Sequence, residues 1–401
     1  MTIRSIIAAG TLALGATTAL QAASHSDGIK LGFLGGITGP IESLMPPIQG
    51  GAQMVVDEVN GAGGIGDGKM IELVVGDTTC VDATAAANAA DRMVNVDEVT
   101  AIVGAMCSGA TIAAANNAAV PAGVVMVSPA STSPALTGLD DNDHVFRTAP
   151  SDAFQGGVLA QAVLDRGIGN VAVTYVNNDY GKGFAESFAA AFEEAGGTVA
   201  LSEAHEDGKA DYRPEIGNLA SAGADALVVL AYVDGSGGTI VQQAVESGDF
   251  DTFVGGDGMV GDAIGERAGA EADGMIATRP GSPDLPGADT FRTNAEAAGV
   301  DPDATFAAQS YDAAMLLALA MEVTGGSKDG LNGALRDVAT APGTKVFPGE
   351  FAKAKELIAA GEDIDYEGAS GSHEFDEAGD VPGDYDTMVV RDGKFVVESE
   401  L

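Results

Sequence analysis

The chain has 401 residues, 46% of them hydrophobic, which is enough to form the cores of two domains. It carries 59 Asp and Glu against 19 Lys and Arg, a formal net charge of −40. A field of that sign repels nucleic-acid backbones and anionic lipids, so no nucleic-acid partner is expected. We interpret the acidic excess as a heavily hydrated surface suited to a saline habitat.

The first 23 residues have the pattern of a signal peptide. Arg4 supplies a positive charge, residues 6–20 are apolar and rich in Ala, and residues 20–23 offer small side chains for cleavage. No later stretch has about twenty uninterrupted apolar residues. The sequence therefore predicts a soluble protein exported to the periplasm.

Strands and helices alternate through the first part of the mature chain. Strands are predicted at residues 29–34, 70–76, 100–104 and 124–128, and helices at 47–60, 83–95 and 109–119. Asp82 is expected to cap the second of these helices through its carboxylate. Alternation of this kind predicts βαβ units and a parallel sheet.

The same alternation restarts after an extended piece at residues 144–150. Ser151 and Asp152 are expected to cap a helix that runs to residue 165. Further strands are predicted at 171–177, 198–205, 226–232 and 250–256, and a second crossing at 274–280. Helices are predicted at 182–195, from residue 213, after residue 232, and at 304–323, 330–338 and 351–360. The end of the chain, 373–399, alternates like paired antiparallel strands.

This order predicts two α/β lobes that each draw on more than one chain segment. We expect residues 27–147 and 280–384 to form an N-terminal lobe, and residues 150–278 and 386–401 to form a C-terminal lobe. Such interleaving requires several crossings between the lobes, and crossings form a hinge.

Two cysteines, Cys80 and Cys107, each follow a predicted strand. In an oxidising compartment such a pair is most simply a disulfide. The loop closed would contribute about 3–4 kcal/mol by the chain-entropy relation. The four histidines are scattered without metal-ligand spacing, so no metal site is predicted.

Enzyme signatures are weak in this sequence. Ser108 follows a strand and precedes a helix, but GAMCSG lacks the G-x-S-x-G spacing of a nucleophile elbow. The Gly-rich stretches give neither a dinucleotide fingerprint nor a Walker lysine and are interpreted as turns. We predict no catalytic residue and no cofactor.

Polar groups gather where predicted strands end. Two apolar runs, residues 101–106 and 124–128, lead into small, hydroxyl-rich turns suited to a small anion, because backbone N–H groups converge there. The candidates in these turns are Ser108, Ala130, Ser131 and Thr132. Tyr232 and Asp257 end strands in the second half. On the residues alone, Asp257 is either a turn former or a ligand-binding group, and Tyr180 in NDYGKG is equally open.

The chain resembles the periplasmic substrate-binding proteins of ABC transporters for branched-chain amino acids, the leucine/isoleucine/valine-binding type. The resemblance covers the mature chain and is carried by TGPIES (38–43), the cysteine pair, GAMCSGAT (104–111), VSPAST (127–132) with PALT after it, VFRTAPSD (145–152), NDYGKG (178–183) and SYDA (310–313). It implies a type I periplasmic binding protein fold: two doubly wound parallel-sheet lobes joined by a three-strand hinge, in a monomer.

The resemblance also implies roles for single residues. Ser108, Ala130 and Thr132 match positions that bind an amino acid's α-carboxylate. Tyr232 and Asp257 match the positions for the α-ammonium, with Asp257 in place of the usual Glu. Tyr180 and Phe306 match positions that line the side-chain pocket, and Leu44 stands where the leucine-type proteins carry an aromatic residue.

The function implied is a receptor that closes around an aliphatic amino acid and delivers it to an ABC permease in the inner membrane. Leu44 and the shorter Asp257 suggest a pocket of altered shape. The alternatives are an amide, a urea-like molecule or an aromatic or other carboxylate as ligand, and a role as sensor or chemoreceptor instead of transport.

Overall fold

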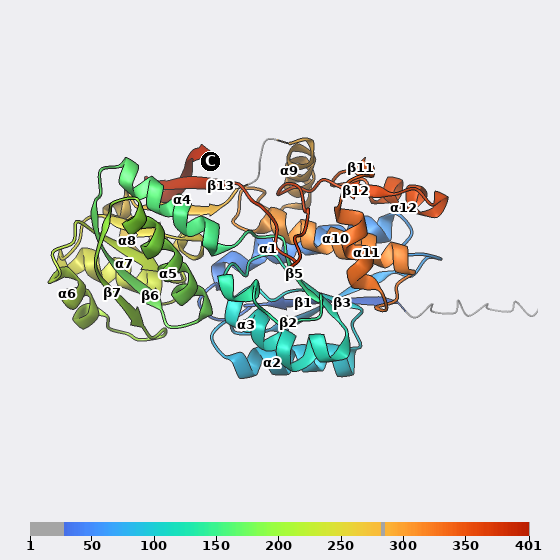
Figure 1. The fold of residues 1–401 in the computed structure, drawn as a ribbon, viewed down its shortest axis with the longest axis horizontal. Helices are drawn as coiled ribbons and strands as arrows, with labels where there is room; N and C mark the ends of the chain where they lie inside the picture. The colour runs from blue at the N-terminus through green and yellow to red at the C-terminus, as the bar shows by residue number, and fades with distance from the viewer. Residues whose placement is uncertain (1–27, 282–284, 401) are drawn as a thin grey trace, which may run out of the picture.

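Two β-sheets, each flanked by helices, make up most of the computed structural model, which describes residues 28–281 and 285–400 (Figure 1). The expected signal peptide, residues 1–23, lies outside the described residues. Within the described residues no helix is both long and apolar enough to cross a bilayer.

The first sheet has five parallel strands in the order β2-β1-β3-β4-β5. Its strands are β1 Ile29–Gly35, β2 Ile71–Asp77, β3 Ala101–Gly104, β4 Val125–Ser128 and β5 Val145–Arg147. Every residue of β3, β4 and β5 is buried, as their continuous apolar runs predict for strands covered on both faces. The helices that accompany this sheet are α1 Met45–Gly61, α2 Ala83–Arg92 and α3 Ser108–Ala114, together with α9 Pro286–Ala298, α10 Ala307–Thr324, α11 Leu331–Ala339 and α12 Phe351–Ala360 from later in the chain.

The second sheet has seven strands in the order β14-β13-β10-β9-β8-β6-β7. Its strands are β6 Asn170–Val176, β7 Thr198–His205, β8 Ala226–Leu230, β9 Phe253–Gly255, β10 Ile276–Pro280, β13 Tyr385–Arg391 and β14 Lys394–Glu400. The strands from β10 to β7 are parallel, and β13 and β14 add an antiparallel edge. Its helices are α4 Asp152–Asp165, α5 Asp179–Glu194, α6 Arg213–Ala220, α7 Ser236–Ser247 and α8 Ala263–Ala268. The predicted fold class is confirmed.

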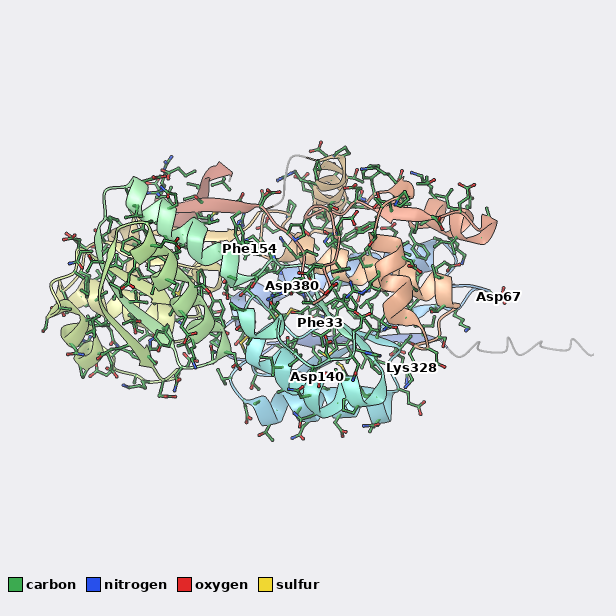
Figure 2. The ribbon with its side chains drawn as sticks, viewed as in Figure 1. Phe33, Asp67, Asp140, Phe154, Lys328 and Asp380 are labelled. Carbon is green, nitrogen blue, oxygen red and sulfur yellow. A yellow bond between two sulfur atoms is a disulfide. The ribbon has the colours of Figure 1, made fainter. Side chains whose placement is uncertain are left out.

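Helix α10 ties the late part of the chain to the first sheet. All residues from Ala307 to Met321 are buried, so this helix is covered on every side, and it packs against α1, α11 and α12. Gly51 of α1 makes the closest approach, because a Cβ there would lie 2.5 Å from the Ala307 carbonyl oxygen. Side chains such as Phe33 of β1 fill the interior, whereas Asp67 and Asp140 are exposed (Figure 2).

Several predicted helix starts are confirmed. Asp82 caps α2 by accepting from the Thr84 and Ala85 N–H groups, and Ser151 caps α4 by accepting from Ala153 N–H. Other boundaries differ. Helix α5 begins at Asp179 instead of residue 182, because the Asn178 side chain caps it, and α10 begins three residues late, because Phe306 adopts a left-handed conformation (φ 66°).

Several elements were missed, among them the short helix α8. Helix α9 was not predicted because its sequence is largely polar and lacks an apolar stripe, since only three of its thirteen residues are buried. The short parallel pair β11 Thr344–Val346 and β12 Ile364–Tyr366 was also not predicted. The prediction of paired strands over 373–399 holds only from residue 385, since residues 373–384 are irregular and lead to the second sheet.

The chain crosses between the sheets in three places that lie side by side. The crossings follow β5, follow β10 and precede β13. The Tyr385 hydroxyl donates to the Ser151 carbonyl oxygen at 3.1 Å, and Gly281 N–H donates to the Asp384 carbonyl oxygen at 2.8 Å. These bonds join the three crossings into one bundle, as a hinge requires.

The predicted Cys80–Cys107 disulfide is present, and both cysteines are buried. It links the turn after β2 to the turn between β3 and α3, across a sequence separation of 27 residues. The bridge therefore fixes the turn that begins α3 to the turn after β2, across the intervening strand β1.

We predict that the double variant Cys80→Ser/Cys107→Ser loses about 3 kcal/mol of unfolding free energy, because the unfolded chain regains the freedom of a loop of that length. Urea unfolding followed by circular dichroism measures the change. A reducing agent should lower the midpoint of the natural chain and leave the double variant unaffected. Equal midpoints for the two proteins would contradict a stabilising role for the bridge.

Candidate functional site

A narrow pocket lies between the carboxyl ends of the two sheets. Turns after β3, β4, β8 and β9 contribute to it, which is where ligands bind in open α/β sheets. Its lining residues are Ile41, Leu44, Ile48, Met106, Cys107, Ser108, Ala130, Tyr180, Tyr232, Asp257, Gly258 and Phe306. Seven of the nine ligand-binding residues predicted from the sequence are in this set; Ser131 and Thr132 are not.

The hydroxyl groups in the two turns of the first half of the chain have different hydrogen-bond partners. Ser108 lines the pocket, and its Oγ accepts from Ser133 N–H at 3.2 Å, so the hydroxyl hydrogen remains able to donate to a ligand. Ser131 is fully buried, and its Oγ lies 2.7 Å from Thr111 Oγ1 and 3.2 Å from the Ala105 carbonyl oxygen. Ser131 therefore holds the two turns together.

The second half contributes two stacked tyrosines and a carboxylate. The rings of Tyr180 and Tyr232 stack at 5.1 Å between centroids. The Tyr180 hydroxyl donates to Asp257 Oδ1 at 2.7 Å, and Gly258 N–H donates to the same oxygen at 2.6 Å. Asp257 Oδ2 is buried and has no hydrogen-bond partner among the described residues. One carboxylate oxygen is thus fixed and the other is left to accept.

Leu44 and Phe306 lie on the apolar side of the pocket with Ile41, Ile48 and Met106. Leu44 is half-buried, and Phe306 is 6% exposed. The left-handed backbone of Phe306, uncommon for an aromatic residue, sits at the start of α10, where the ring reaches the pocket. These side chains leave space for an apolar group of modest size.

Among the buried side-chain oxygens that have no hydrogen-bond partner among the described residues, those of four residues belong to the region of Asp257 and the 130–133 turn. They are Thr132 (Oγ1), Asp152 (both oxygens), Gln155 (Oε1) and Asp257 (Oδ2), called here the acceptor cluster. Asp152 and Gln155 were missed as candidate site residues. Asp152 had been interpreted as a helix cap, but Ser151 caps α4 and the Asp152 carboxylate is left over. In the sequence, Asp152 stands two residues after a Pro in VFRTAPSD, and this context indicates only a helix cap and no ligand-binding role.

Burial acts on both carboxyl groups of this cluster. It raises the pKa of Asp257 to about 6, against the hydrogen bonds from Tyr180 and Gly258, which lower it. Burial, and then the Asp257 charge, raise the pKa of Asp152 well above its usual value, while the Thr132 hydroxyl and Arg147 act in the opposite direction. Neither carboxylate has a cationic partner within hydrogen-bonding distance among the described residues.

The buried cation nearest in sequence, Arg147, has its donors committed elsewhere. Its Nε and Nη2 donate to the two Asp380 oxygens at 2.6 and 2.7 Å. The remaining bonds go to Thr137 Oγ1 and to the Ser131 and Ser133 carbonyl oxygens, at 2.9, 3.3 and 2.9 Å. All five N–H groups are used, so Arg147 positions the 130–133 turn instead of neutralising the acceptor cluster.

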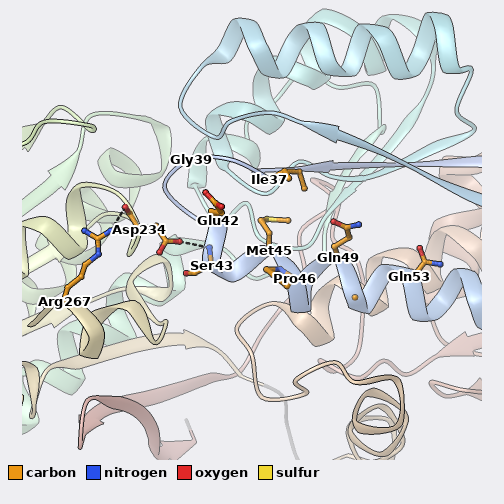
Figure 3. A pocket seen from close by; sticks show the side chains of 11 residues that line it. Ile37, Gly39, Glu42, Ser43, Met45, Pro46, Gln49, Gln53, Asp234 and Arg267 are labelled. Atoms are coloured by element: carbon orange, nitrogen blue, oxygen red, sulfur yellow. Dashed lines mark hydrogen bonds between the residues drawn. The ribbon is translucent and has the colours of Figure 1, made fainter. Parts of the chain in front are cut away.

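The two halves also touch on either side of the pocket. Ser43 N–H donates to Asp234 Oδ2 at 2.7 Å, and Asp234 N–H donates to the Pro40 carbonyl oxygen at 3.1 Å. Figure 3 shows this contact at the edge of a larger groove, with Arg267 donating to the Asp234 carbonyl oxygen. A second contact joins Ser133 Oγ to the Asp179 carbonyl oxygen at 2.9 Å. The pocket is therefore closed from both sides.

Comparisons with known proteins agree with this geometry. A family model described as periplasmic binding protein matches residues 28–394. The chain is 30% identical to a leucine-, isoleucine-, valine-, threonine- and alanine-binding protein of Pseudomonas aeruginosa, over 75% of this chain and 79% of the relative.

Solved structures are similar over nearly the whole chain. A leucine-binding protein from Thermotoga maritima superposes with a TM-score of 0.78 at 27% identity, covering 93% of this chain and 98% of that one. A branched-chain amino acid transporter substrate-binding protein from Streptococcus pneumoniae, in complex with isoleucine, gives 0.76 at 29% identity, covering 93% and 98%.

We predict that Asp380→Ala lowers the unfolding free energy by about 3 kcal/mol, because it leaves the buried Arg147 charge without its carboxylate. The matched control is Glu246→Ala, which removes the partner of the half-exposed Arg213 and should cost less than about 1 kcal/mol. Urea unfolding of both variants measures the difference. Similar losses in the two would contradict a special role for the Arg147–Asp380 pair.

Proposed function

Because the chain belongs to the periplasmic binding proteins of the leucine/isoleucine/valine-binding type, we propose that it captures an amino acid with a small aliphatic side chain. We propose that it then delivers this ligand to an ABC permease after export to the periplasm. The ligands named for the relatives, which are leucine, isoleucine, valine, threonine and alanine, support this ligand class.

The observation that carries the proposal is the acceptor cluster. It contains two buried carboxyl groups and further open oxygens, and Arg147 is unable to serve them. A buried carboxylate is stable only when a cation or several donors compensate it. A ligand ammonium supplies both a charge and three N–H donors, so an amine-bearing ligand fits where an amine-free carboxylate leaves the cluster unpaired.

The carboxylate and side chain of an amino acid ligand would contact the other walls of the pocket. The Ser108 hydroxyl and the turn at Ala130 offer neutral donors to the α-carboxylate, with the Thr132 hydroxyl between this side and Asp152. The side chain would occupy the space bounded by Ile41, Leu44 and Phe306. The side chains on this wall are apolar, which favours an aliphatic group.

Closure of two lobes would trap the ligand. We propose the lobes as residues 27–147 with 280–384, and 150–278 with 386–401, because helices α9 to α12 pack with the first sheet and the hairpin β13–β14 belongs to the second. The contacts between Ser43 and Asp234 and between Ser133 and Asp179 would form on closure and break on release.

We predict that Asp257→Asn weakens binding of the tightest amino acid in a panel of leucine, isoleucine, valine, threonine and alanine by at least about tenfold. The substitution removes the charge that pairs with the ammonium and keeps the shape of the side chain. Calorimetry on protein stripped of bound ligand gives the affinities, and the exposed Glu271→Gln serves as control. Equal affinity in Asp257→Asn and the natural chain would remove Asp257 from the site.

The raised pKa of Asp257, about 6, predicts a pH dependence. Below that pH the ligand-free carboxyl group holds a proton that must leave before it accepts an ammonium, so the affinity falls as the pH drops from about 7 to about 5. Calorimetry across this range should show the decline in the natural chain and a shallower one in Asp257→Asn. An affinity that rises on acidification would contradict this assignment.

A further inference from the structure

Phe306 is the wall between two cavities. It lines the pocket described above, and it also lines a second cavity next to the crossings, to which Arg279, Arg292 and Asp303 contribute. No other described residue belongs to both linings. A ring with space on two sides is held less firmly by its neighbours than a ring in a close-packed core. The position of this ring therefore depends on the backbone that carries it.

The backbone at Phe306 is strained and needs support. Its φ of 66° lies in the left-handed region, which an aromatic residue keeps only where the surrounding structure holds it there. After Phe306 the support is helix α10, since the Phe306 carbonyl oxygen accepts from Ser310 N–H at 3.0 Å. Before it, residues 301–306, called here the entry loop, contain neither helix nor strand. The contacts of the entry loop thus decide where the ring lies.

Arg279 joins the entry loop to two of the crossings. Its Nη1 donates to the Asp303 carbonyl oxygen at 2.5 Å, and its Nε donates to Asp386 Oδ2 at 3.1 Å. Arg279 of β10 lies directly opposite Asp386 of β13 in the second sheet. The two side chains are only 12% and 10% exposed, so water and salt screen this pair weakly.

The other hydrogen-bonded contacts of the entry loop with the rest of the described chain are weaker. Arg292 of α9 pairs with the Asp303 carboxylate, but these side chains are 50% and 65% exposed, and an exposed pair contributes little. Thr305 Oγ1 donates to the Val260 carbonyl oxygen at 3.4 Å, which is long for a hydrogen bond. Arg279 therefore makes the main attachment.

We propose that Arg279 is a positioning residue for ligand selectivity: by holding the Asp303 carbonyl oxygen, it sets how far Phe306 closes the apolar end of the pocket. This inference rests on the proposed function. A branched side chain long enough to contact the ring gains from its position, whereas alanine has a single methyl group and depends on it little. Because Arg279 also pairs with Asp386, this wall is fixed relative to the crossings.

The test uses Arg279→Met, which keeps most of the side-chain length and removes the N–H donors. Ligand-stripped proteins are titrated calorimetrically with alanine, valine, isoleucine and leucine. We expect Arg279→Met to bind leucine and isoleucine at least about tenfold more weakly and alanine within about twofold of the natural chain, because only the larger side chains lose apolar contact. The charge-matched control Arg213→Met, in a half-exposed pair with Glu246, should match the natural chain. Equal losses for alanine and leucine, or no loss for either, would overturn the proposal.

A double-mutant cycle shows whether Arg279 acts through Phe306. Phe306→Ala removes the ring, so the loss of Arg279 has no wall left to displace. The double variant should then bind leucine within about twofold of Phe306→Ala alone. A merely structural role for Arg279 would add its own loss to that of Phe306→Ala, and additive losses would overturn the proposal.

Arg279→Lys is the second variant, for the case that Arg279→Met does not fold. Its ammonium stays with the Asp386 carboxylate, and a single ammonium does not span both acceptors as a guanidinium does. We expect the same selective loss for leucine, and an unchanged ratio of leucine to alanine affinity would overturn the role of Arg279 while leaving the proposed function standing. If the natural chain binds none of the amino acids, the proposed function itself fails, so the two failures are distinguishable.

Discussion

Two buried carboxyl groups without a protein cation are the constraint around which this pocket is built. Asp257 and Asp152 approach from the turn after β9 and the start of α4, and both are fully desolvated. The surrounding groups hold both residues in place without neutralising their charges. Tyr180 and Gly258 donate hydrogen bonds to one oxygen of Asp257, and the Asp152 backbone N–H donates to the Thr132 carbonyl oxygen. In the function proposed above, a ligand cation completes the arrangement, and this requirement selects the ligand more sharply than the apolar walls do.

Arg147 connects this site to the crossings. It lies at the end of β5, at the first crossing, and its bidentate partner Asp380 lies in the segment that leads to the third. Its remaining donors hold the carbonyl oxygens of the turn that presents Ala130 and Thr132. A buried arginine thus stabilises the fixed side of the pocket, the Cys80–Cys107 bridge secures the neighbouring turn, and the contacts made by Asp234 and Asp179 belong to the side that closes.

The sequence was informative where a pattern has one physical meaning. Buried parallel strands, the signature turns and the cysteine pair led to the correct fold class, and Ser108, Tyr180 and Asp257 were brought together as expected. It was misleading where one residue type serves two purposes. The Ser151–Asp152 pair predicts a cap equally well from either residue, and only the three-dimensional arrangement shows that Ser151 takes this role. Ser131 carries a hydroxyl group that could bind a ligand, but this hydroxyl group contacts Thr111 and Ala105 instead. Those contacts depend on the packing of two turns, which the sequence does not show.

A crystal structure of the protein with a bound primary amino acid such as leucine tests the central claim most directly. We predict that the ligand nitrogen lies within about 3.2 Å of Asp257 Oδ2, with the ligand carboxylate at Ser108 and the turn at Ala130. A ligand bound in the reverse orientation, or an ammonium that makes no contact with Asp257, would contradict the account.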